Sequence, residues 1–256
     1  MNHPARMIVT DLDGTLLQSD KRISDYTAEI LGRCREKGHK LVFATARPLR
    51  AVRLYADSIP LDAMIIHGGS IVYANDTELF RYGIPAEMAR NILLSLRRDY
   101  PGARLCAEIN DTLYANYTVP IEWNHTEAVF TDFTDLPERM VEKILIHVSS
   151  MEEMADLVRY LPGDLYIEIT ERTLALVMNR EATKLKGVQA LCRHFGIALE
   201  QVVAFGDDYN DMGMLKGCGL GVAMGNALDE VKAVADETCG TNDEDGVARW
   251  LAGRLL

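Results

Sequence analysis

Short apolar runs alternate with amphipathic stretches at both ends of this chain, and this alternation constrains the fold more than any other feature. In the N-terminal third, apolar runs at residues 7–10, 40–45 and 63–67 are separated by amphipathic stretches at 24–37 and 49–58. Strands that alternate with helices in this order are typical of a parallel sheet with helices on both faces. The N-terminal third therefore predicts part of a doubly wound α/β sheet.

The last third of the chain repeats this alternation. Helices are predicted over residues 184–195, 211–216, 228–235 and 247–256, and strands over 201–205 and 219–223. Both thirds are therefore assigned to one doubly wound parallel sheet with a Rossmann-like arrangement.

The middle of the chain has a different pattern. Helices are predicted over 87–100 and 151–160, and strands over 104–109, 112–117, 144–148, 165–169 and 174–178. Turn signals at Asn110-Asp111 and Glu171-Arg172 indicate antiparallel hairpins. We therefore predict an α/β core of residues 1–82 and 181–256, interrupted by an inserted α+β domain at residues 83–180, a length typical of a domain.

Composition and charge argue against several functional classes. The chain has 38 acidic and 27 basic residues, whereas nucleic-acid affinity depends on clustered lysine and arginine. Its five cysteines form no Cys-x-x-Cys pair, so neither a disulfide framework nor a zinc site is predicted. No apolar segment is long enough for a signal peptide or a membrane span. We expect a cytoplasmic monomer or weak homo-oligomer with no nucleic-acid or membrane partner.

The first apolar run ends at Asp11, which is followed by Leu12, Asp13, Gly14 and Thr15. Ligands of open α/β sheets collect at the carboxyl ends of strands. Two carboxylates held close together there need a cation or a shared proton. A calcium-binding loop is the alternative interpretation, but position twelve of such a loop would be Arg22 instead of Glu, and a strand precedes the motif.

Polar side chains also follow two other predicted strands. The run at 40–44 leads to Thr45 and Arg47, whose hydroxyl and guanidinium groups suit a phosphate or another anion. The run at 202–205 leads to Asp207, the natural direct ligand for Mg²⁺. Asn210 and Asp211 open the next helix, where helix capping is the alternative to a role beside the metal.

Lys184 precedes the helix that leads to the strand before Asp207 and Asp211. From there its ammonium group can offset the charge of the crowded carboxylates. Lys186 is its main competitor, and a solvated surface lysine is the alternative for either. The run from Gly217 to Gly221 superficially matches a dinucleotide fingerprint, but it lies between a helix and a strand, the reverse of the required order.

Together these residues resemble the four motifs of the haloacid dehalogenase superfamily: Asp11 to Thr15, Thr45, Lys184, and Gly206 to Asp211. The inserted domain and the stretches 221–227 and 242–246 are similar to the Cof-type sugar-phosphatase branch, which has an α+β cap of this kind. The chain departs from the family at Ala46, where Gly is usual, and at Gly68-Gly69-Ser70, where Asn-Gly-Ala is usual.

The resemblance implies a chemistry. Asp11 would attack phosphorus to form an aspartyl-phosphate, and Asp13 would protonate the leaving group and later activate water. Mg²⁺ would be held by Asp11, the backbone carbonyl of Asp13, and Asp207, with Lys184 and Thr45 sharing the charge neutralisation. Within the same family pattern, the substrate-binding residues would be Arg47, Gly68 and Gly69.

The expected activity is hydrolysis of small phosphorylated metabolites, with hexose phosphates suggested by analogy. A phosphomutase of the same fold remains an alternative. A phospho-acceptor signalling domain does not fit, because it carries its acceptor Asp on a later strand and has no inserted cap. An inactive binding protein is disfavoured by the intact motifs. The resemblance implies that residues of the cap choose the substrate; the candidates are Glu108, Tyr114, Asn116, Trp123 and Glu168, and a place in the core of the cap is the alternative for each.

Overall fold

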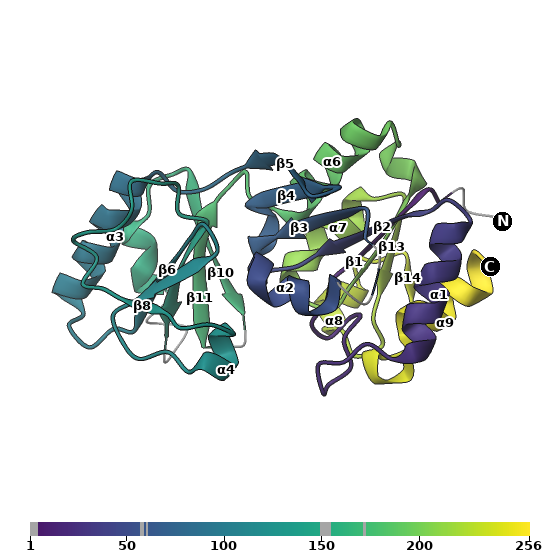
Figure 1. Cartoon of the computed structure of the whole chain (residues 1–256), viewed down its shortest axis with the longest axis horizontal. Helices are drawn as coiled ribbons and strands as arrows, with labels where there is room; N and C mark the ends of the chain where they lie inside the picture. Colours follow the sequence, from purple (N-terminus) through teal and green to yellow (C-terminus); the bar gives the residue numbers. More distant parts are fainter. Residues whose placement is uncertain (1–4, 57–58, 60, 149–154, 171–172) are drawn as a thin grey trace. The chain divides into compact units, whose positions relative to one another are not determined.

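The structure is a computed structural model that describes residues 5–56, 59, 61–148, 155–170 and 173–256 (Figure 1). The chain divides into two compact units. The first comprises Met1–Arg47, Val52–Phe80 and Thr183–Leu256, and the second comprises Pro48–Ala51 and Arg81–Ala182.

The first unit is built on an eight-stranded sheet in the order β14-β13-β12-β1-β2-β3-β4-β5 (Figure 1). The strands are β1 (Met7–Thr10), β2 (Lys40–Ala44), β3 (Ala63–Ile66), β4 (Ile71–Ala74), β5 (Thr77–Arg81), β12 (Val202–Gly206), β13 (Leu220–Ala223) and β14 (Glu237–Thr238). Pairing is parallel from β14 to β3, and β4 is antiparallel to β3. All of β1 is buried, as expected of a strand covered on both faces. The predicted α/β class is confirmed.

Among the described residues, the first unit contains the helices α1 (Asp25–Glu36), α6 (Lys184–Phe195), α7 (Met212–Gly217), α8 (Asp229–Lys232) and α9 (Gly246–Arg254). Helix α2 (Leu49–Ala56) starts in the second unit and ends in the first. Helix α1 packs against α9, and α6 against α7. Ser24 caps α1 by accepting a hydrogen bond from the Thr27 N–H, and Gly196 ends α6 with a φ of 62°.

The second unit has a six-stranded sheet in the order β10-β11-β9-β6-β7-β8. Its elements are α3 (Ala86–Asp99), β6 (Leu105–Ile109), β7 (Thr112–Ala115), α4 (Ile121–Asn124), β8 (Val129–Phe130), β9 (Lys143–His147), β10 (Leu165–Thr170) and β11 (Leu174–Asn179). Among the strands described in this sheet, β7 and β8 pair in parallel and the other neighbours pair antiparallel. Buried side chains of α3, including Ile92, Leu93 and Leu96, pack into a core with this sheet.

The hairpin predicted at Asn110-Asp111 is confirmed, because both residues have positive φ (50° and 63°) and join the antiparallel pair β6 and β7. The turn predicted at Glu171-Arg172 lies outside the described residues, as does the first part of the helix predicted over 151–160.

Two predicted helices differ from the structure in length or starting point. The helix expected over 228–235 is the single turn α8, and the helix expected to start at 211 starts at Met212, after a 3₁₀ turn at Tyr209–Asp211. Among the helices that the structure describes, none is long and apolar enough to cross a bilayer.

Candidate active site

The carboxyl ends of β1, β2 and β12 lie next to one another in the first unit. Strand β1 pairs in parallel with both neighbours, so that Thr10 lies opposite Phe43 of β2 and Phe205 of β12. Asp11, Thr45 and Asp207 therefore follow three adjacent strand ends. This is the edge at which open α/β sheets bind their ligands.

Lys184 is the first residue of α6, and its ammonium group is at the centre of the acidic cluster. Its Nζ lies 2.9 Å from Asp11 Oδ1, 2.7 Å from Asp211 Oδ1 and 2.8 Å from Asn210 Oδ1. Burial alone would lower the pKa of Lys184, but the charges of Asp11 and Asp211 raise it well above its ordinary value. Lys184 therefore stays charged while only 2% exposed.

The side chain of Asp211 is already occupied by protein donors. Its Oδ2 accepts hydrogen bonds from the backbone N–H groups of Asp207 (2.9 Å) and Asp208 (3.1 Å), and its Oδ1 accepts from Lys184. Asp211 therefore fixes the loop after β12, which leaves Asp207 and Asp11 as the carboxylates better placed to take a metal.

The cluster fits a divalent cation with oxygen ligands. Carboxylate oxygens of Asp11, Asp207 and Asp211 all lie within 4.8 Å of one another. Burial, reinforced by neighbouring carboxylates, raises the pKa of Asp11 well above its ordinary value although Lys184 opposes this. Burial also raises the pKa of Asp207 to about 7, against a hydrogen bond from Thr15. A cation such as Mg²⁺ would relieve this crowding of negative charge.

This crowding predicts how Mg²⁺ and pH act together on stability. With a pKa of about 7 in the folded state against 3.8, Asp207 keeps a proton that the unfolded chain has released, so its contribution to stability is lost as pH rises from about 4 to 7. Mg²⁺ bound at Asp207 would compete with that proton and should therefore raise the melting temperature by several degrees more at pH 7.5 than at pH 5.5.

Thermal melts of the wild type and of Asp207→Asn, with and without Mg²⁺, measure this effect. In Asp207→Asn, Mg²⁺ should raise the melting temperature much less than in the wild type, and the small rise should not depend on pH. An equal Mg²⁺ shift at both pH values, or an undiminished shift in the variant, would contradict the assignment.

Asp13 faces two cations. Its Oδ2 lies 2.6 Å from Arg47 Nε, and its Oδ1 lies 2.8 Å from Arg47 Nη2 and 2.7 Å from Lys21 Nζ. Burial acts in the opposite direction, but hydrogen bonds and charges from Arg47 and Lys21 lower the pKa of Asp13 to about 2. Arg47 also stacks on Tyr55, 5.3 Å from the ring centroid. Sequence reasoning missed Lys21, and its only signal was a basic residue in the turn after the motif.

Gly14 is required by both its conformation and its surroundings. Its φ is 73°, and a Cβ atom there would lie 2.3 Å from Asp207 Oδ2. Thr15, the next residue, donates a hydrogen bond to Asp207 Oδ1 at 2.6 Å. The loop after β1 therefore orients the carboxylate at the end of β12.

Gly14→Ala should displace Asp207 and lower kcat/KM for a phosphate ester by about 100-fold, since misplacement of a reacting group by about 1 Å can cost that much. Gly38→Ala is the matched control, because Gly38 has a φ of 90° and a Cβ atom there would meet none of the described residues within 4 Å. It shares the backbone cost of about 1–2 kcal/mol without the contact. Steady-state kinetics and denaturant melts separate the two, and equal activities of the two variants would contradict this role of Gly14.

Thr45 and the loop after β3 complete the site. Thr45 is buried, and its Oγ1 accepts a hydrogen bond from the Arg47 N–H. The Gly68 N–H donates to the Thr45 carbonyl at 2.9 Å. At Gly69, φ is 115° and a Cβ atom would lie 2.3 Å from the Thr183 backbone. Gly69 therefore lets this loop pack against Thr183, the residue at the N-terminus of α6. The expected contact of Gly68 and Gly69 with substrate remains a prediction.

The residues singled out in the second unit are Glu108, Tyr114, Asn116, Trp123 and Glu168. Glu108 is buried and forms an ion pair with Arg50, whose Nη2 lies 2.8 Å from Oε1. Asn116 bonds backbone groups at the start of β6, accepting from the Leu105 N–H and donating to the Ala103 carbonyl. Both side chains thus have structural partners, and the side chain of Trp123 lies outside what the structure describes.

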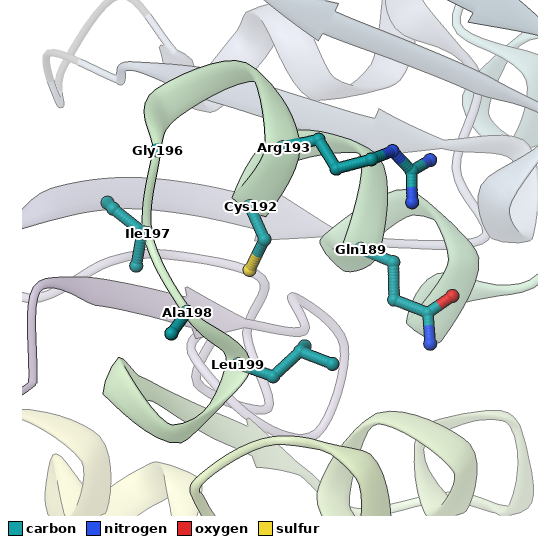
Figure 2. A pocket seen from close by; sticks show the side chains of 7 residues that line it. All are labelled: Gln189, Cys192, Arg193, Gly196, Ile197, Ala198 and Leu199. Carbon is teal, nitrogen blue, oxygen red and sulfur yellow. The ribbon is translucent and has the colours of Figure 1, made fainter.

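A groove of about 650 Å³ lies at the C-terminal end of α6, the opposite end from Lys184 (Figure 2). The residues that line it are Gln189, Cys192, Arg193, Gly196, Ile197, Ala198 and Leu199. In Figure 2 the Arg193 side chain extends away from Cys192. Burial raises the pKa of the Cys192 thiol to about 11, so this cysteine is a poor nucleophile, and no carboxylate is among the lining residues.

The parallel α/β sheet and the acidic cluster at its strand ends define the class of protein, an enzyme of the α/β class whose carboxylates could hold a divalent cation. The family model for haloacid dehalogenase-like hydrolases matches residues 8–251, and the chain belongs to this family. It is a phosphatase of the haloacid dehalogenase type.

Curated proteins and solved structures are similar to this chain over almost its whole length. The 5-amino-6-(5-phospho-D-ribitylamino)uracil phosphatase YitU of Bacillus subtilis is 31% identical, with 96% of each chain covered. The pyridoxal phosphate phosphatase YbhA of Escherichia coli is 28% identical, covering 98% of this chain and 99% of its own. A solved sugar phosphatase of subclass IIB is 26% identical with a TM-score of 0.87, covering 97% of this chain and 98% of its own.

Proposed function

We propose that this protein is a Mg²⁺-dependent phosphatase that hydrolyses small phosphomonoesters through an aspartyl-phosphate on Asp11. The observation that supports this most is the position of Lys184, whose ammonium contacts Asp11 and Asp211 at the sheet edge where Asp207 also lies. A buried cation beside a carboxylate nucleophile can offset the charge that phosphoryl transfer concentrates there.

In the first step, a carboxylate oxygen of Asp11 attacks phosphorus and the bond from phosphorus to the ester oxygen breaks. Arg47 is the main group that holds the pKa of Asp13 low, so once Arg47 has turned toward the substrate Asp13 would take up a proton and give it to the departing oxygen, so that an alcohol leaves. Lys184 and the Thr45 hydroxyl would bind phosphoryl oxygens, and Arg47 would turn from Asp13 toward the substrate.

In the second step, Asp13 takes a proton from water, the water oxygen attacks phosphorus, and the bond to Asp11 breaks to give inorganic phosphate. Splitting hydrolysis in two lets one carboxylate act first as acid and then as base. Mg²⁺, held by Asp11, Asp207 and the backbone carbonyl of Asp13, would supply charge neutralisation when bound.

The substrates we propose are phosphate esters of primary alcohols, with hexose phosphates among them. The relatives are named for a phosphoribityl compound and for pyridoxal phosphate, and both carry phosphate on a primary carbon. Such esters have poor leaving groups, which suits an enzyme with a dedicated proton donor. We further propose that the protein acts on free metabolites in the cytoplasm as a monomer or weak homo-oligomer.

A panel of phosphorylated metabolites tests this proposal, with free phosphate measured with and without Mg²⁺. It should include hexose 6-phosphates, a phosphoribityl compound and pyridoxal phosphate. We expect phosphate release that depends on Mg²⁺ from at least one of them. Isomerised sugar phosphate without net phosphate would instead identify a phosphomutase, and no release from any ester would overturn the proposal.

A further inference from the structure

A closed turn at residues 18–22 follows the segment that carries Asp11 and Asp13. The Gln18 N–H donates to the Arg22 carbonyl at 2.9 Å, and the Lys21 N–H donates to the Gln18 carbonyl at 2.8 Å. Lys21 itself has a φ of 64°, in the left-handed region that non-glycine residues seldom adopt. The turn therefore fixes the backbone from which the Lys21 side chain extends.

The two oxygens of Asp13 are not equally occupied. Oδ1 accepts from both Lys21 Nζ and Arg47 Nη2, whereas Oδ2 accepts from Arg47 Nε alone. Each carboxylate oxygen has about two lone-pair sites. Within the described residues, the remaining site is on Oδ2, and a carboxyl group that carries its proton there can still accept from Lys21 at Oδ1.

The C-terminal stretch 242–246 holds this turn in place. Asp243 accepts hydrogen bonds from both the N–H and the hydroxyl of Ser19, each at 2.7 Å. Asn242 donates from Nδ2 to the Leu17 carbonyl at 2.9 Å. A part of the chain more than two hundred residues away thus anchors the turn on both sides of Gln18.

We infer that Lys21 is a positioning residue for Asp13: from a turn anchored by Asp243, its ammonium group fixes the orientation in which Asp13 exchanges a proton through Oδ2. This inference rests on the proposed function, in which Asp13 is the acid and base. The Lys21 side chain is 57% exposed, and an ion pair so exposed contributes little to stability. Its removal should therefore change the orientation of Asp13 without unfolding the chain.

The leaving group provides the readout. An alkoxide needs a proton as it departs, whereas p-nitrophenolate departs without one, and kcat/KM reports the first step when that step is irreversible. Loss of acid positioning should therefore lower kcat/KM for an alkyl phosphate much more than for p-nitrophenyl phosphate. A general loss of structure would lower both equally.

The test compares Lys21→Met with Arg22→Met, a control in the same turn whose side chain pairs with Asp20. We expect Lys21→Met to lose about tenfold in kcat/KM for the best alkyl ester of the panel and less than twofold for p-nitrophenyl phosphate. Lys21→Arg should keep most of the wild-type kcat/KM on both esters, and Arg22→Met should behave as wild type. Asp243→Asn should show the same split between the two esters, a larger loss on the alkyl ester than on p-nitrophenyl phosphate, to a smaller extent. Melting temperatures verify that each variant folds.

Equal losses on both esters, no loss on either, or a gain on the alkyl ester would overturn the inference. Asp13→Asn separates this failure from failure of the proposed function. If Asp13→Asn shows the split and Lys21→Met does not, only the role of Lys21 is wrong. If Asp13→Asn shows no split in an enzyme that hydrolyses both esters, the acid assignment itself is wrong.

Discussion

Asp11→Asn is expected to lower kcat/KM for phosphomonoesters by about 10⁴-fold or more, the largest loss of any single substitution, because an amide cannot act as the carboxylate nucleophile. The substitution conserves volume, and the amide oxygen can still accept from Lys184 Nζ, which lies 2.9 Å from Oδ1. The fold should therefore persist, so that the loss reports chemistry. Steady-state phosphate release with Mg²⁺ is the measurement.

Asp20→Asn is the matched control for this substitution. Asp20 lies in the turn after the catalytic segment and forms an exposed ion pair with Arg22, so its neutralisation should leave activity within twofold. Near wild-type turnover of Asp11→Asn would show that Asp11 is not the nucleophile.

Lys184→Met is expected to destabilise the protein by about 3–5 kcal/mol as well as to abolish most activity. Removing the ammonium leaves Asp11 and Asp211 buried without their cation, and breaking one side of a buried ion pair typically costs this much. Urea unfolding without Mg²⁺ measures the loss in free energy of unfolding, and the rate of phosphate release measures the loss of activity.

Lys186→Met provides the comparison in the same turn of α6. Lys186 is half-buried, whereas Lys184 reaches the carboxylates, so the Lys186 variant should keep most of its stability and turnover. If turnover were lost only in the Lys186 variant, the lysine of the site would have been assigned to the wrong residue.

The strand-end part of the site could be predicted because it depends on local pattern and topology alone. Asp11, Thr45 and Asp207 each follow an apolar run, and parallel strands place their carboxyl ends on one edge. The sequence favoured Lys184 over Lys186 only by its spacing within the family motifs, because both residues belong to the first turn of α6, and the structure adds the contact between Lys184 and Asp11.

The contacts that orient these groups could not be predicted. Thr15 bonds Asp207 across 192 residues of sequence, and Ser19 bonds Asp243 across 224. Their residue types are ordinary in loops, and no periodicity links one partner to the other. The ion pair between Lys21 and Asp13 is nearer in sequence, but it depends on a positive φ at Lys21 that the residue type does not indicate.

In the fold, the strands at the centre of the first sheet were predicted, whereas β4, β5 and β14 toward its two sides were not. Residues 71–81 form β4 and β5, and residues 237–238 form β14, all outside the central part of the sheet. Half-exposed edge strands such as β5 lack the continuous apolar run that identifies a buried parallel strand.

The covalent intermediate shows most directly whether Asp11 is the nucleophile. Asp13→Asn should form the aspartyl-phosphate from p-nitrophenyl phosphate and hydrolyse it slowly, because it lacks the base for the second step. Acid quenching, digestion and mass spectrometry of the peptide spanning residues 7–21 locate the phosphoryl group. We expect one phosphoryl group on Asp11; a phosphoryl group on any other residue of an enzyme that turns over would show that Asp11 is not the nucleophile.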